Sequence, residues 1–104
     1  MAILSIDTSD NKKIEIKIDS KLKKLEIGNG VKFLRAENCL KLISELLNEN
    51  DLEITDLKAV NINIGPGSFT GLRVGISIAN SLATLLHIPV NSKKIGELVF
   101  PVYN

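Results

Sequence analysis

The hydrophobic and polar positions of the first thirty residues follow the patterns of β-strands. Residues 2–6 are apolar on both sides of the chain, apart from Ser5, which is typical of a buried central strand. Residues 12–19 alternate isoleucines with charged residues, and this period of two indicates a half-buried strand. Residues 21–27 alternate less regularly and lead into a glycine-rich turn at residues 28–30. We therefore predict three strands in an antiparallel meander.

The rest of the chain switches between helical and strand patterns. Residues 37–49 carry apolar side chains over roughly 160° of a helical wheel, as in an amphipathic helix. Residues 58–64 alternate as a strand, and residues 71–87 form a second helix. Residues 88–90 begin a further short strand, and residues 92–100 have the spacing of a short helix. This order, β-β-β-α-β-α-β, predicts an α/β fold with a mixed sheet and two main helices.

The second helix is apolar over roughly 200°, about twice the arc that packing on one sheet requires. Within this arc, small residues recur at every fourth position: Gly71, Gly75, Ala79 and Ala83. Small residues at this spacing allow another backbone to come close. Two interpretations remain open, namely tight packing on the chain's own sheet and on the 37–49 helix, or contact with a second chain.

A glycine-rich loop connects the fourth strand to this helix. Three glycines and a proline fall within residues 65–71. Backbone N–H groups at a helix start attract anions, so this order of elements is that of phosphate-binding loops. The spacing G-x-G-x-x-x-G nevertheless differs from G-x-G-x-x-G, and no Lys-Ser/Thr pair follows as in a P-loop. Ser68 or Thr70 can cap the helix. The candidate phosphate-binding residues are Gly65, Gly67, Ser68, Thr70, Arg73 and Asp7.

Asp7 and Arg73 flank the glycine loop. Asp7 ends the first strand, where an aspartate accepts N–H groups of the turn that follows. Arg73 lies in the first turn of a helix, where a cation opposes the helix dipole, so we expect an anion beside it. We rank a carboxylate of the same chain first, either Glu37 or Asp7. An acidic group of a partner or a phosphate is the alternative.

Composition narrows the classes of function. A net charge of +1 argues against a dedicated nucleic-acid binder. We interpret the lysines between residues 12 and 24 as protection of a sheet edge, with tRNA contact as the alternative. Cys39 is the single cysteine, so we expect a buried helix residue and no internal disulfide. The chain opens without a signal pattern and shows no apolar run of membrane-spanning length, so we predict a cytoplasmic protein with no membrane partner.

The residues offer little for catalysis. The only histidine, His87, lies at the far end of its helix from the glycine loop. Nucleophilic catalysis by Ser68 would need a positioned base, and the sequence identifies none. We therefore predict no catalytic residue and no metal site.

The glycine loop is also a sequence signature. Residues 65–75, Gly-Pro-Gly-Ser-Phe-Thr-Gly-Leu-Arg-Val-Gly, resemble the signature of the TsaB (YeaZ) family. Residues 3–9 look like that family's first strand and turn, and residues 56–60 lead into the loop as they do in the family. The resemblance implies one ribonuclease-H-like lobe of the actin-type (ASKHA) fold over residues 1–104, which the element order also suggests. On this resemblance we expect the chain to correspond to the N-terminal lobe only, without the second lobe of the family.

The resemblance further implies a function through partners. TsaB proteins assist TsaD, which transfers a threonylcarbamoyl group to the adenosine beside the anticodon of tRNA, and the ATPase TsaE joins them. We expect this chain to be a non-catalytic subunit that binds and activates TsaD, and that contacts tRNA only indirectly. ATP would bind only in complex with the partners, and a homodimer through the same helices would be a resting state. TsaD-type enzymes carry a paired-histidine metal motif, which a chain with one histidine cannot supply.

The two helices are the predicted partner surface, since they would pair with the equivalent helices of TsaD. On this interpretation Gly75→Leu or Ala79→Glu should abolish TsaD binding and leave the monomer folded. The expected partner-binding residues are Cys39, Leu40, Ile43, Leu47, Gly71, Leu72, Gly75, Ile76, Ala79 and Ala83.

The alternative function is that of a small nucleotide- or phosphate-binding enzyme. It would use the Gly-Pro-Gly-Ser-Phe-Thr-Gly loop together with Arg73 and Asp7. In the wider superfamily an aspartate at the position of Asp7 can hold a metal–nucleotide complex. This hypothesis accounts for the loop and leaves the excess apolar surface of the second helix unexplained.

Overall fold

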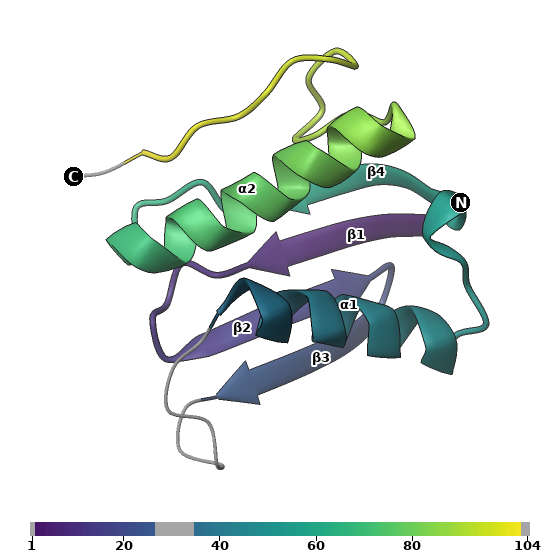
Figure 1. Ribbon diagram of the computed structural model, residues 1–104, viewed down its shortest axis with the longest axis horizontal. Helices are drawn as coiled ribbons and strands as arrows, with labels where there is room; N and C mark the ends of the chain where they lie inside the picture. The colour runs from purple at the N-terminus through teal and green to yellow at the C-terminus, as the bar shows by residue number, and fades with distance from the viewer. Residues whose placement is uncertain (1, 27–34, 103–104) are drawn as a thin grey trace.

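A four-stranded mixed sheet forms one layer of the protein. The computed structural model describes residues 2–26 and 35–102. The strands lie in the order β3-β2-β1-β4, with β1–β2 and β2–β3 antiparallel and β1–β4 parallel (Figure 1). The predicted meander is therefore confirmed, and the predicted turn at residues 28–30 lies outside the described residues. The strands are β1 (Ala2–Asp7), β2 (Lys13–Ile18), β3 (Lys21–Glu26) and β4 (Leu57–Ile62).

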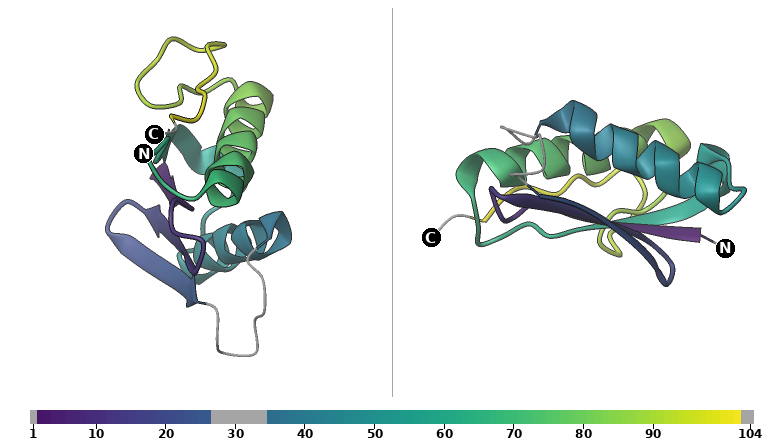
Figure 2. Two further views of the ribbon diagram at one scale, coloured as in Figure 1. Left: turned by 90° about the vertical axis from the view of Figure 1, so that its left-hand side faces the viewer. Right: turned by 90° about the horizontal axis from the view of Figure 1, so that it is seen from below.

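Two helices form the second layer, and both cover the same face of the sheet (Figure 2). Helix α1 (Ala36–Glu49) packs on β2 and β3, and helix α2 (Phe69–Leu86) packs on β4 and β1. A single 3-10 turn, η1 (Ile54–Asp56), precedes β4. Because β3 and β4, the strands that precede these helices, run in the same direction, α1 and α2 also run side by side in the same direction (Figure 1).

The core lies between the two layers and consists of branched aliphatic side chains. The β2 isoleucines Ile14, Ile16 and Ile18 are at most 2% exposed, as their alternation predicts. Each contributes roughly 1.5–3 kcal/mol through burial. Val60 of β4 and Cys39 of α1 are fully buried as well. The helix layer therefore covers one continuous apolar face of the sheet.

The other face of the sheet is uncovered by the described residues, and this corrects the expectation for the first strand. Strand β1 lies centrally between β2 and β4, as predicted. However, Ile3 is 40% exposed, and Ser5 and Asp7 are only partly buried, because these side chains point away from the helices. Strand β1 is thus buried on one side only.

The segment after α2 differs from its predicted structure. Residues 88–90 form a single parallel bridge, Val60–Val90, where we predicted the start of a strand. Asn91 and Ser92 follow with φ of 51° and 61°, and these left-handed conformations turn the chain away from the sheet. Residues 92–100 form turns and extended chain where we predicted a short helix. Val99 occupies a buried position, 2% exposed, that an extended segment reaches along α2.

The wide apolar arc of α2 is covered only in part by the chain itself, and Leu85 remains 76% exposed. Its buried residues face the sheet, one flank faces α1, and Asn80 on another flank binds the backbone of Val99. The helix spans 18 residues with a mean hydropathy of 1.3, so it is long and apolar enough to cross a membrane by these criteria alone. This corrects the expectation that no such run exists. Packing on the sheet accounts for part of this composition, since 39% of the helix is buried.

The buried thiol of Cys39 provides a test of this packing. Burial raises the pKa of the Cys39 thiol to about 12, and its side chain is fully buried. We expect it to react with a disulfide reagent at pH 8 roughly a thousandfold more slowly than an exposed thiol, since reaction requires opening of the fold. In a Ser44→Cys variant, which adds an exposed thiol to the same helix, one thiol should react at once and one slowly. Rapid reaction of both thiols would contradict the packing of α1.

Candidate functional site: the glycine loop and the helix layer

The glycine loop lies at the edge of the sheet where β1 and β4 end. Because these strands are parallel, the turn after β1 and the loop after β4 leave the sheet at the same edge (Figure 1). Helix α2 begins at this edge. The structure therefore brings together the predicted residues of the first turn and of the loop, among them Asp7, Gly67 and Ser68.

The loop packs directly against the turn after β1. The Ser68 N–H donates to the Ser9 carbonyl oxygen over 2.6 Å. The Thr8 hydroxyl, in a residue only 2% exposed, donates to the Gly71 carbonyl oxygen over 2.7 Å. A Cβ atom on Gly67 would collide with Ser9, and one on Gly71 or Gly75 would collide with Thr8. These glycines are thus required because the backbone and side chains of the chain's own turn approach them closely.

Gly65 is required for a second reason. Its φ of 114° lies in a region that side-chain-bearing residues rarely adopt. A Cβ atom there would also collide with the carbonyl oxygen of Val102, whose N–H donates to Ile64 over 2.7 Å. The start of the loop is therefore shaped by the C-terminal segment.

Ser68 is the residue that caps α2. Its hydroxyl oxygen accepts the Gly71 N–H at 3.3 Å, and its carbonyl oxygen accepts the Leu72 N–H at 2.9 Å. Thr70 lies one residue inside the helix and is exposed. Of the two predicted caps, the structure selects Ser68.

Asp7 is held by the turn that follows it. Its Oδ1 accepts the Ser9 hydroxyl at 2.6 Å and the Ser9 N–H at 2.9 Å, while its Oδ2 accepts the Asn63 amide at 3.4 Å. Burial of this carboxyl acts to raise its pKa, but the hydrogen bonds from Ser9 and Asn63 outweigh burial, so the pKa of Asp7 lies below 3.8. This is the predicted turn chemistry. Asn63 was not predicted, although its position one residue beyond β4, parallel to β1, is the signal that places it beside Asp7.

Arg73 corrects an expectation. Among the residues that the structure describes, it forms no ion pair, so neither Glu37 nor Asp7 is its partner. Its guanidinium instead lies over the ring of Phe69, 4.7 Å from the ring centre, in a cation–π contact. The side chain is exposed, so solvent reduces the need for a counter-charge at the helix start.

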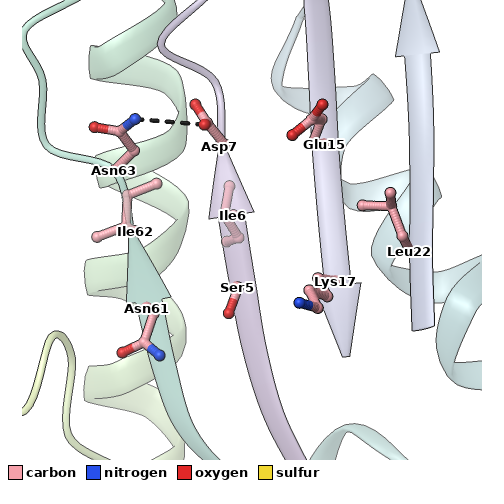
Figure 3. A pocket seen from close by; sticks show the side chains of 9 residues that line it. All are labelled: Ser5, Ile6, Asp7, Glu15, Lys17, Leu22, Asn61, Ile62 and Asn63. Atoms are coloured by element: carbon pink, nitrogen blue, oxygen red, sulfur yellow. Dashed lines mark hydrogen bonds between the residues drawn. The ribbon is translucent and has the colours of Figure 1, made fainter. Parts of the chain in front are cut away.

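The open face of the sheet carries a shallow depression of about 330 Å³ beside Asp7 (Figure 3). Glu15 and Lys17 of β2 lie along it, and Asn61 and Asn63 form its far side. Across the β2–β3 pair, Glu15 lies opposite Lys24, and Lys13 lies opposite Glu26. Because acids and lysines alternate in this way, the lysines of residues 12–24 on this face are largely offset by neighbouring carboxylates.

An apolar groove of about 260 Å³ lies in the helix layer, between α1 and α2. Leu40 is 49% exposed at the groove, and Ile54 of η1, at its end, is 41% exposed. Ser44, Asn48 and Glu53 contribute its polar part. The apolar residues that line the groove are Leu40, Ile43, Leu47, Leu52, Ile54 and Leu82.

Most of the predicted partner-binding residues belong to the chain's own core. Gly71 is partly buried, and Leu40 is the exposed member of the set. Gly75 lies against Thr8 and Ile62, so Gly75→Leu would collide with both, and Ala79 is fully buried, so Ala79→Glu would bury a charge. These substitutions would disrupt the monomer, contrary to our expectation. The buried members are Cys39, Ile43, Leu47, Leu72, Gly75, Ile76, Ala79 and Ala83.

The described part of the chain contains no cluster of three or more histidine, cysteine, aspartate or glutamate side chains that could hold a metal ion. A mixed sheet, two helices on one face and a glycine loop at the carboxyl edge define the class: a ribonuclease-H-like lobe of the actin type.

Comparison with known proteins supports this class and identifies the family. The family model of TsaD, tRNA N6-adenosine threonylcarbamoyltransferase, matches residues 34–92. The tRNA threonylcarbamoyladenosine biosynthesis protein TsaB of Bacillus subtilis is 32% identical over 118 residues, which cover 100% of this chain and 50% of that protein. The chain belongs to the TsaB (YeaZ) family, as the signature at residues 65–75 predicted.

Solved structures agree. YeaZ from Pseudomonas aeruginosa superimposes with a TM-score of 0.70 and 26% identity, over 89% of this chain and 43% of that one. A second Pseudomonas aeruginosa structure, with the same TM-score and identity, is described as an uncharacterized protein with similarity to peptidase YEAZ. The chain thus spans half or less of the length of these relatives.

The contact of Thr8 with Gly71 predicts a loss of stability on mutation. Thr8→Val keeps the shape of the side chain and removes the buried hydroxyl donor, so the free energy of unfolding should fall by roughly 1–2 kcal/mol. Thr8→Ser retains the hydroxyl donor, so it should keep the part of the free energy of unfolding that comes from this hydrogen bond. Urea unfolding followed by circular dichroism measures both. A Thr8→Val variant as stable as the parent would show that the hydrogen bond does not anchor α2.

Asp7 predicts a pH dependence. Its pKa is lower when folded than unfolded, so its contribution to stability is fully present above the unfolded value of about 3.9 and is lost as the pH falls through the folded value. Asp7→Asn should therefore cost about 1 kcal/mol at pH 6, and this difference from the parent should shrink toward pH 3. Ser9→Ala, which removes one donor, should move the Asp7 carboxyl titration seen by NMR toward its ordinary range. A constant difference between pH 6 and pH 3 would contradict the assignment.

Proposed function

We propose that this chain is a non-catalytic subunit in the formation of threonylcarbamoyladenosine in tRNA, and that it binds and activates TsaD. The observation that carries the proposal is the apolar groove between α1 and α2. It lies on the surface formed by two parallel helices, and Leu40 and Ile54 remain about half exposed there. Exposed apolar side chains clustered along a groove mark surfaces that bind other proteins.

The groove suits a helical partner. Leu40 is the exposed side chain of this flank of α1, and the buried Ile43 and Leu47, at i+3 and i+7, form the floor of the groove, so a helix of the partner can pack against Leu40 over this floor. Ser44 and Asn48 border these residues and supply hydrogen-bonding groups at the rim. The match of residues 34–92, which include both helices, to the TsaD family model supports a partner with related helices. On this proposal the contact involves the equivalent helix pair of TsaD.

The remaining parts of the proposal concern the assembly. TsaE joins the complex, ATP binds only once the partners are assembled, and tRNA contacts the complex without direct contact to this chain. In the absence of TsaD, the same groove pairs two copies of the chain. The alternative, a small phosphate-binding enzyme, has less support, because Thr8 and Ser9 already pack against the glycine loop and Ser9 and Asn63 already bind Asp7.

A pair of matched substitutions tests the proposal. Leu40→Glu places a charge in the groove, and Leu22→Glu places the same charge on the open face of the sheet, where Leu22 is 53% exposed. Both positions are exposed, so both variants should fold. Light scattering after size-exclusion chromatography with TsaD from the same source should show a one-to-one complex for the parent and for Leu22→Glu. Leu40→Glu should weaken binding by about a hundredfold or more.

Two results would count against the proposal. A complex with Leu40→Glu as tight as that of the parent would show that the groove is not the interface. A parent chain that stays monomeric with TsaD present, but binds ATP with Mg²⁺ in calorimetry, would favour the phosphate-binding alternative.

A further inference from the structure

The groove between α1 and α2 lies toward the C-terminal ends of both helices. Leu47 and Asn48 in the last turn of α1, Leu82 near the end of α2 and Ile54 of η1 all line it. Because the two helices run in the same direction, the negative ends of both helix dipoles lie at the η1 end of the groove (Figure 1). Each helix places roughly half an elementary negative charge at its C-terminus. The backbone alone therefore makes this end of the groove electronegative.

Acidic side chains add to the negative potential at this end. Residues 36–57, which include α1 and η1, contain six acidic residues and one lysine. Glu53 lines the groove next to Ile54, and Asp51 lies two residues earlier, just beyond the end of α1. Both carboxylates are exposed, so they are solvated in the free chain. Apolar surface and negative charge thus lie side by side in one groove.

The described residues supply little positive charge to offset these two carboxylates. Neither α1 nor α2 has a basic residue in its last turn. The ion pairs within the described part of the chain lie elsewhere, within β2 and between β3 and α1, and include neither Glu53 nor Asp51. Lys58 lines a separate depression together with Asp56, and Lys41, the lysine of α1, does not line the groove. The negative charge at the groove is therefore available to a partner.

We infer that the partner of this groove places a lysine or arginine side chain beside Glu53, while its apolar side chains cover Leu40. This inference rests on the proposed function and specifies the chemistry of the surface that the chain recognises. A partner that covers the groove removes water from Glu53, and a carboxylate without water or a cation is unfavourable. A cation at that position steers association and satisfies the carboxylate, whereas an acidic group there is rejected. Charge thus selects among helical partners that share the same apolar pattern.

Reversal of the charge tests the inference. Glu53→Lys changes the groove, and Glu97→Lys makes the same change in net charge on the segment after α2, where Glu97 is also exposed. Both variants should fold, which circular dichroism checks. In calorimetry with TsaD from the same source, at pH 8 and about 50 mM NaCl, Glu97→Lys should bind within about threefold of the parent, and Glu53→Lys about thirtyfold or more weakly.

A neutral variant separates the effect of charge from that of shape. Glu53→Gln keeps the size of the side chain and removes its charge, so it should bind TsaD about tenfold more weakly than the parent at about 50 mM NaCl. Because salt screens charges, this difference should fall below about threefold at about 1 M NaCl. Replacement by glutamate of the lysine or arginine of TsaD that faces Glu53 should restore the binding of Glu53→Lys.

The possible failures are distinguishable from one another. If the parent binds TsaD and both Glu53 variants bind as tightly, the charged contact is overturned and the proposed function stands. A loss of affinity in Glu53→Gln that is equal at both salt concentrations would also overturn the charged contact, since it would arise from shape. A parent that does not bind TsaD at either salt concentration would overturn the proposed function and this inference together.

Discussion

The close approach of α2 to the turn after β1 is the contact on which the rest of the structure depends. Thr8 donates to the first turn of the helix, and Ser9 accepts the N–H of its cap. Three glycines make this approach sterically feasible. The contact fixes the height and direction of α2 over β1 and β4. The groove beside α1 and the pairing of Asn80 with the backbone of Val99 both depend on the position of that one helix.

This contact changes the meaning of the glycine-rich loop. Glycines between a strand and a helix indicate that something comes close to the backbone, and a phosphate is one such group. Here the close group is the chain's own turn at Thr8 and Ser9. The hydrogen bonds that lower the pKa of Asp7 come from the same turn and from Asn63. In this chain, the glycines of the family signature therefore allow the helix to pack closely against the turn that follows the first strand.

The sequence predicts those features that have a local period. The alternation in residues 12–19 and the amphipathic arc of residues 37–49 correctly placed β2 and α1. The apolar arc of a helix does not reveal whether it packs on the same chain or on a partner. For this reason Gly75 and Ala79 were predicted to form a partner surface, whereas they belong to the core. The side-chain amides of Asn80 and Asn91 bind the backbone of Val99 and of Ile62, in the place of a neighbouring strand. Such amides leave no periodic pattern in the sequence, so these two contacts were not predicted. The partner of Arg73 was predicted wrongly, because the rule that a cation opposes the dipole at a helix start takes no account of the aromatic ring of Phe69 one turn away.

The two edges of the sheet are closed in different ways. The β3 edge carries lysines, of which Lys23 pairs with Glu49 of α1, so charge discourages another strand there. At the β4 edge, the Asn91 amide pairs with the backbone of Ile62, and residues 89–91 pair with the backbone of Val60. With both edges closed, the partner that we propose has no strand to extend, so it would bind through side chains of the helix layer such as Leu40 and Ile54.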